Sequence, residues 1–199
     1  MIKKTILEII KKRLKPIDET NQFGLQYIEG YCDQVWQEFV INMERSSDYD
    51  PNFYNKEYTV NGMSGSGVSG YYIDLPEEII NIPKIGSGVV SIKIKDTFNY
   101  FEPVSEDDFK HIRTQGVFRQ ADDVYFYVSY AKIFFGGGGI TGTVPTDSMV
   151  LTLNIPFSKY LLTEVLPLPS IRESLFIDTV VERLMGTPPP DLINNNSDQ

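Results

Sequence analysis

Apolar residues recur at helical spacing in the first part of the chain. In residues 2–14 the isoleucines return to one face, and Pro16 ends the segment. A longer segment runs from about Asn21 to Met43, and either Thr20 or Asn21 can cap its start. Its apolar stripe consists of Leu25, Ile28, Cys32, Val35, Trp36, Phe39 and Met43. These patterns predict two N-terminal helices.

A further helical pattern lies near the C-terminal end. Ser170 stands three residues before Glu173, in the spacing of a capping box, and Gly186 with the prolines beyond it provides a stop. The expected apolar face consists of Ile171, Leu175, Val180, Val181 and Leu184. We therefore predict a helix over this segment that buries these side chains.

The chain between these helices has the patterns of strands and turns, from about Phe53 to Ile155. Residues 124–135 (VYFYVSYAKIFF) are aromatic and β-branched on both faces, which predicts one central strand. A short helix is expected at 105–113, where Ser105 precedes Asp108 by three residues. Two more strands are predicted by alternation, one with Val90, Ile92 and Ile94 opposite Ser91, Lys93 and Lys95, the other with Leu151, Leu153 and Ile155.

This order of elements predicts an α+β fold, in which the terminal helices pack as a small bundle and an antiparallel β domain is inserted between them. The expected parts are 1–46, the N-terminal helices; 47–156, the β-rich insertion; 157–186, the helical return to the bundle; and 187–199, an extended Pro/Asn tail.

Composition and charge narrow the function classes. The 199 residues are 41% hydrophobic and 23% charged, as in folded globular proteins, and no apolar run approaches the roughly 18 to 20 residues of a membrane helix. The net charge is −9, but residues 1–15 carry six basic side chains and one acidic, a local charge of +5, so the remainder carries −14. Such an acidic body should not hold nucleic acid tightly. The basic first helix either contacts an acidic partner or forms a solvated face.

Two glycine patterns resemble phosphate-binding loops but lack their context. Gly65, Gly67 and Gly70 spell GxGxxG, yet they lead into a predicted strand rather than a helix, so a hairpin tip is expected. The run Gly136–Gly139 has no lysine and serine at a helix start, which favours a mobile loop.

The remaining candidates for chemistry are few. Cys32, the single cysteine, excludes an intrachain disulfide and is expected to be a small buried hydrophobe. His111, the single histidine, is expected on the surface of the short helix, and one His with one Cys excludes the usual zinc sets. Acidic pairs at Glu77-Glu78, Asp107-Asp108 and Asp122-Asp123 are more typical of caps and solvated turns than of a carboxylate enzyme. We therefore expect no catalytic residue, cofactor or metal.

The layout and two segments resemble a known family. DLPEEIINIPKIG and LNIPFSKYLLTEVLPLPSIRESLFIDTVVERLMG look like the head-to-tail adaptor (connector ring) proteins of short-tailed, crAss-like bacteriophages. The resemblance implies a homo-oligomer, usually a dodecameric ring, bound to the portal protein and to adjacent tail ring proteins. Double-stranded DNA would pass through without specific binding. It also implies a place in the neck or tail of the virion, after assembly in the host cytoplasm and without a membrane.

The resemblance gives the tail 187–199 the role of an arm that reaches a partner. Its partner-binding residues would be Pro188, Pro189 and Pro190 as a stiff extended piece, with Leu192 and Ile193 as anchors. Two alternatives stay open. One is a different virion component, such as a capsid decoration or fibre-base protein, that binds through the β domain. The other is a small enzyme or ligand-binding domain, which requires a pocket with convergent polar groups.

Overall fold

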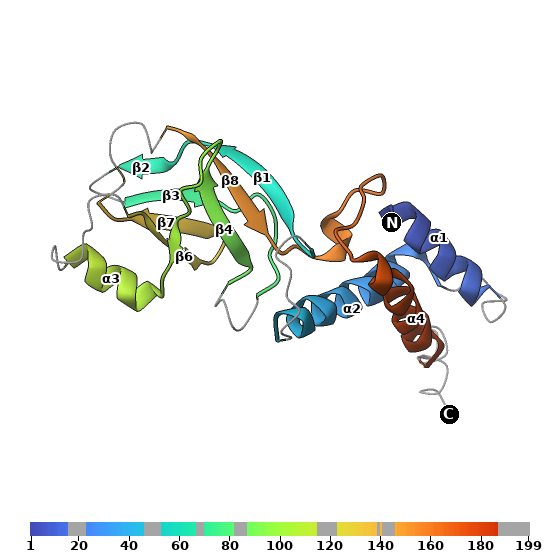
Figure 1. Cartoon of the computed structure of the whole chain (residues 1–199). Helices are drawn as coiled ribbons and strands as arrows, with labels where there is room; N and C mark the ends of the chain where they lie inside the picture. Colours follow the sequence, from blue (N-terminus) through green and yellow to red (C-terminus); the bar gives the residue numbers. More distant parts are fainter. Residues whose placement is uncertain are drawn as a thin grey trace, which may run out of the picture. The chain divides into compact units, whose positions relative to one another are not determined.

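The computed structural model describes residues 1–15, 23–45, 53–66, 70–81, 87–114, 123–138, 140 and 146–186 (Figure 1). The chain divides into two compact units. The first, here called the helical unit, combines Met1–Tyr54 with Pro156–Gln199, and the second, the β unit, is Asn55–Ile155. The predicted α+β fold is confirmed, with helices at both ends of the chain and sheets between them.

The helical unit contains the three predicted long helices. They are α1 (Lys3–Leu14), α2 (Leu25–Arg45) and α4 (Ser170–Gly186), joined by a short 3-10 helix, η2 (Phe157–Lys159). The expected caps of α2, Thr20 and Asn21, lie outside the described residues. The core is built from one apolar stripe on each helix, represented by Ile6, Ile10 and Leu14, by Ile28, Val35, Trp36 and Val40, and by Phe176, Val180 and Leu184.

Trp36 of α2 is the centre of an aromatic cluster. Its ring centroid lies 5.5 Å from that of Tyr54, 5.6 Å from Tyr160 and 5.9 Å from Phe176. Phe157 of η2 completes the cluster, with its ring stacked on Phe176 at 5.7 Å. These rings come from α2, η2 and the residue after it, α4, and the bend at Tyr54, so the cluster joins the two sequence halves of the helical unit.

Lys3 of α1 is a basic residue, but its side chain is buried. It is 2% exposed, and its Nζ lies 2.9 Å from the Glu29 carboxylate of α2. The ammonium group also donates to the carbonyl oxygens of Ser158, at 3.1 Å, and Tyr160, at 2.9 Å. Its aliphatic stem and charge lie over the Phe157 ring, 5.0 Å from the centroid. Lys3 thus joins α1 to α2 and η2 instead of contributing to a basic surface.

The β unit contains two sheets. One sheet is antiparallel, in the order β1 (Lys56–Asn61), β8 (Ser148–Leu153) and β4 (Val89–Ile94). The second has the order β2 (Ser64–Ser66), β3 (Gly70–Asp74), β7 (Lys132–Gly136), β6 (Tyr125–Ser129) and β5 (Glu102–Pro103). Only the β5–β6 pair is parallel among the described strands. Helix α3 (Glu106–Thr114) follows β5, as the capping pattern predicts.

The single strand predicted over 124–135 is wrong, because the segment forms the β6–β7 hairpin. Ser129 pairs with Lys132, so Tyr130 and Ala131 make a two-residue turn. Tyr130 adopts φ +55°, a left-handed conformation that usually favours glycine or asparagine. Since neither of those residues is present, the sequence carries no signal for this turn.

The alternation predicted for β4 holds from Ser91 onward and is wrong at Val90. A β-bulge between Val89 and Ser91 shifts the pairing of β4 with β8, so Val89 pairs with Leu153 and Ser91 with Thr152. As a result Val89 and Ile92 are fully buried while Val90 is half-buried. Val90 is the extra residue of the bulge and has no partner on β8, so it leaves the predicted alternation.

Candidate partner-binding surfaces

The arm predicted to bind a partner lies outside the described residues. This applies to Pro188, Pro189, Pro190, Leu192 and Ile193, and to the whole range 187–199. Their role stays a prediction, so the surfaces considered below come from the two described units.

The GxGxxG segment forms a hairpin between β2 and β3, as expected from its context. Ser64 pairs with Tyr72, and the chain after Gly70 continues as a strand. Gly65 has φ +99°, and a Cβ there would lie 2.2 Å from the carbonyl oxygen of Gly70. The glycine therefore permits a close approach of two backbones. Gly67 lies outside the described residues.

Two glycines of the second run have packing roles. Gly136 is the last residue of β7, not part of a mobile loop as predicted, and a Cβ there would lie 2.7 Å from Cζ of Phe109. Gly137, at φ +123°, approaches the carbonyl oxygen of Asp123 so closely that a Cβ would lie 2.3 Å away. Gly136 thus lets the Phe109 ring of α3 lie against β7, and Gly137 lets the backbone pass close to Asp123.

Within the described ranges, neither unit by itself brings the candidate catalytic residues together, and Asp122 lies outside those ranges. Cys32 is fully buried in α2, and burial raises the pKa of its thiol. His111 is exposed on α3. Ser105 caps α3: its Oγ accepts from the Asp108 backbone N–H at 3.1 Å, and its hydroxyl donates to the Asp108 carboxylate at 2.6 Å. Within the described ranges, no three His, Cys, Asp or Glu side chains form a group that would hold a metal ion.

The helical unit exposes large apolar side chains on α4 and on the loop before it. On α4, Ile171 is 87% exposed and Leu175 53%, so the prediction that they face the core is wrong. Phe176 and Ile177 take the inward positions instead, because buried residues of α4 recur at 176, 177, 180, 181 and 184. In the loop, Leu161 is 64% exposed and Val165 68%.

The backbone of that loop is held by hydrogen bonds to the start of the chain. The amide N–H of Lys3 donates to the Glu164 carbonyl, and that of Lys4 to the Leu162 carbonyl, both at 3.0 Å. The Leu161 N–H donates to the Glu164 carboxylate at 2.7 Å. These bonds fix the exposed side chains in place, so little order would have to be gained on contact with a partner.

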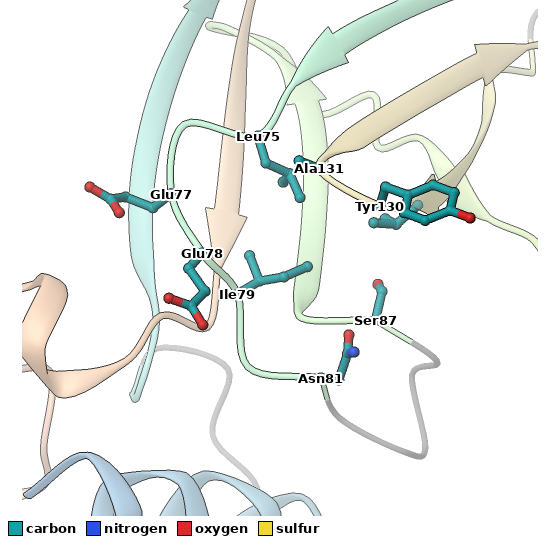
Figure 2. Close-up of a pocket in the computed structure, with 9 residues that line it drawn as sticks. Leu75, Glu77, Glu78, Ile79, Asn81, Ser87, Tyr130 and Ala131 are labelled. Atoms are coloured by element: carbon teal, nitrogen blue, oxygen red, sulfur yellow. The ribbon is translucent and has the colours of Figure 1, made fainter. Parts of the chain in front are cut away.

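The β unit has a pocket of about 650 Å³ between the 75–81 segment and the tip of the β6–β7 hairpin (Figure 2). Leu75 and Ile79 point toward the hairpin, where Ala131 and the fully exposed Tyr130 form the opposite wall. The pocket is also lined by Glu77, Glu78, Asn81, Ser87 and Val128. The carboxylates of both glutamates point away from the hairpin in Figure 2, and the lining combines apolar and polar side chains in similar measure.

The two sides of this pocket are fixed by backbone hydrogen bonds. The Leu75 N–H donates to the Ala131 carbonyl at 2.9 Å, and the Ile80 N–H donates to the Asn154 carbonyl at 2.8 Å. Gly88 lies so close to Ile80 that a Cβ would be 2.4 Å from its carbonyl oxygen. The pocket is therefore formed before any partner arrives.

A second prominent aromatic residue of the β unit is Phe98, which is 92% exposed in the turn after β4. The turn is ordered: the N–H and hydroxyl of Thr97 both donate to the Ile94 carbonyl, at 3.2 and 2.9 Å. Asp96 adopts φ +63° within it. The sequence reasoning did not select Phe98, although a lone aromatic among turn residues (Asp-Thr-Phe-Asn) is an available signal.

Comparisons with protein-family models and with curated proteins returned no match.

The described parts of the chain contain no helix that is long and apolar enough to cross a membrane. Large apolar side chains on ordered backbone, which both units expose, are typical anchors of protein interfaces.

Proposed function

We propose that this chain is a structural subunit of a bacteriophage virion, a ring-forming adaptor that links the portal to the tail around the DNA channel. The observation that carries the proposal is the exposed apolar surface of the helical unit, formed by Leu161, Val165, Ile171 and Leu175. The chain would act by holding other polypeptides in place, without catalysis.

This surface suits an interface between subunits. Removing apolar area from water contributes about 25 cal/mol per Å², and the side chains concerned are large and held on ordered backbone. A closed ring uses two different faces of each subunit, one on each neighbour. The apolar surface of the helical unit supplies one face, and Phe98 and the pocket of the β unit are further surfaces for a contact.

The charge distribution supports a conduit for DNA that does not bind it tightly. The net charge of −9 opposes association with phosphate. The end of α1 is an exception, because Lys11, Lys12 and Lys15 are exposed and make no ion pair within the described residues. We propose that this basic end contacts an acidic surface of a neighbouring protein.

The test is to produce the chain together with the portal and tail proteins of the same phage and to examine the particles by electron microscopy. The proposal expects a ring of this chain at one vertex, between portal and tail. Ile171→Asp should abolish the ring while the subunit stays folded, and Asn42→Asp, at an exposed position of α2 outside this surface, is the matched control. Many copies spread over the capsid would instead support a decoration protein.

A further inference from the structure

The β unit has an exposed aromatic side chain, Phe98, and a pocket with apolar side chains in part of its lining, and the two are complementary. We propose that Phe98 of one copy inserts into the pocket of a second copy, between Ile79 and Tyr130, and so joins the β units head to tail. This contact goes beyond the ring proposal by naming the residues that join neighbouring copies, and it rests on that proposal only for its biological setting.

The position of the two features excludes a contact within one β unit. Ser87, which lines the pocket, lies two residues before the start of β4, and Phe98 follows the end of the same strand. Six residues of β4 at about 3.3 Å each separate them by roughly 20 Å. Phe98 cannot reach the pocket of its own unit, so it must enter that of another copy. Such a contact uses two different faces, and repetition of it gives a row or a ring.

The chemistry of the pocket fits a phenyl ring. Leu75, Ile79 and Ala131 supply apolar walls, and the exposed Tyr130 ring can stack on an entering aromatic side chain. Tyr130 and Phe98 are both held on ordered turns, so neither loses much conformational freedom on contact.

Charges around the two features are complementary. Lys95 is exposed in the turn of Phe98 and makes no ion pair within the part of the chain that the structure describes. Glu77 and Glu78 border the pocket. When the ring of Phe98 enters, the ammonium group of Lys95 comes close to the side of the pocket that carries Glu77 and Glu78. The attraction between these opposite charges favours this orientation of the two copies.

Ser87 adds a polar group that the free subunit does not fully use. It is 7% exposed, and its Oγ accepts from the Val89 N–H at 3.3 Å. Within the described residues its hydroxyl donates to no acceptor. A backbone carbonyl of the entering turn would accept from it. The pocket therefore offers one occupant apolar side chains, the Tyr130 ring for stacking and the Ser87 hydroxyl as a hydrogen-bond donor.

Photochemical cross-linking of the full chain tests the contact directly. Phe98→p-benzoylphenylalanine would be mixed with ¹⁵N-labelled wild-type chain, irradiated and digested. We expect cross-links between differently labelled chains that map to residues 75–81 or 128–131. The absence of an interchain product, or interchain products that map elsewhere, would overturn the proposal.

A complementation experiment tests the direction of the contact. Phe98→Ala removes the insert and keeps the pocket, whereas Ala131→Trp obstructs the pocket and keeps the insert. Each variant alone should self-associate about thirty-fold more weakly than wild type, the loss expected for an interface anchor. An equimolar mixture should form one junction and stop at dimers in sedimentation velocity. A mixture that behaves like the separate variants contradicts the proposal.

Asn99→Ala is the matched control, because it removes an exposed side chain of the same turn. It should leave association unchanged, and circular dichroism melting should be the same for all three variants. The ring proposal is tested apart from this contact. Normal rings formed by Phe98→Ala would overturn the inference and leave the adaptor role intact. Cross-links at the pocket without rings on the portal would support the inference and contradict the adaptor role.

Discussion

Lys3 and Glu29 form an ion pair of 2.9 Å that is largely shielded from water and lies between α1 and α2. The lysine would be costly to bury alone, but its three donors are directed at the carboxylate and at two carbonyl oxygens of the η2 region. A basic residue of the first helix therefore acts in the interior of the helical unit, and only the later lysines of α1 belong to its surface.

We expect Lys3→Ala to lower the free energy of unfolding by about 2–4 kcal/mol, because it leaves a half-buried carboxylate and two carbonyl oxygens without their donor. Lys4→Ala is the control, since the exposed Lys4–Glu8 pair at 3.8 Å should contribute only about 0.3 kcal/mol. Urea denaturation of the full chain measures both. Equal effects of the two substitutions would show that the Lys3 contacts contribute no more than a surface pair.

Substitutions at two adjacent positions of α4 should have very different effects on the free energy of unfolding. Phe176 is fully buried against Trp36, and Phe176→Ala should cost about 3–5 kcal/mol. Leu175 is half exposed, and Leu175→Ala should change stability by less than about 1 kcal/mol. Thermal melts give the comparison. A large loss for Leu175→Ala in the isolated chain would mean that this side chain is already covered.

Gly136 and Phe109 should be energetically coupled. Gly136→Ala would place a Cβ 2.7 Å from the Phe109 ring, so we expect a loss of about 1–3 kcal/mol from overpacking. In a Phe109→Leu background, where the ring is absent, the same substitution should cost much less. The interaction energy from a double-mutant cycle in urea measures this coupling, and additive effects would contradict it.

The Cys32 thiol should be protected in the native state at alkaline pH. Burial raises the pKa of this thiol in the folded chain, whereas a cysteine thiol in the unfolded chain has a pKa of about 8.5. The native state thus retains a proton that the unfolded state loses, and this group lowers stability as pH rises above about 8.5. Iodoacetamide labelling followed by mass spectrometry should be slow and should accelerate only with denaturant. Rapid labelling of the folded chain at pH 9 would contradict the protection of the Cys32 thiol.

The long helices were predictable because their apolar residues repeat over several turns. The stripe that includes Ile28, Cys32 and Trp36 identifies α2 directly, and the capping pattern of Ser105 identifies α3. The buried cysteine follows from the same periodicity. These features depend on neighbours in sequence, which a reading of the chain can use.

The features that were missed depend on partners distant in sequence. The bulge at Val89 is visible only against β8, and the turn at Tyr130 has no characteristic turn residue. On α4 the inward face was misassigned because Ile171 and Leu175 have the same spacing as a core stripe, and only the packing of Phe176 against Trp36 distinguishes them. The pocket combines a segment near residue 78 with a hairpin near residue 130, so no local pattern could indicate it.

The pairing of β1 with β8 has a consequence for how such a chain can change. Lys56 lies opposite Leu153, so the β unit begins and ends on adjacent strands of one sheet, the edge strand β1 and the central strand β8. Adjacent Cα atoms in such a pair are only about 5 Å apart. A different domain whose two termini lie close together can therefore replace the β unit between Tyr54 and Pro156. Such a replacement does not require the aromatic cluster to open. Such an exchange would leave the helical unit and its aromatic cluster unchanged.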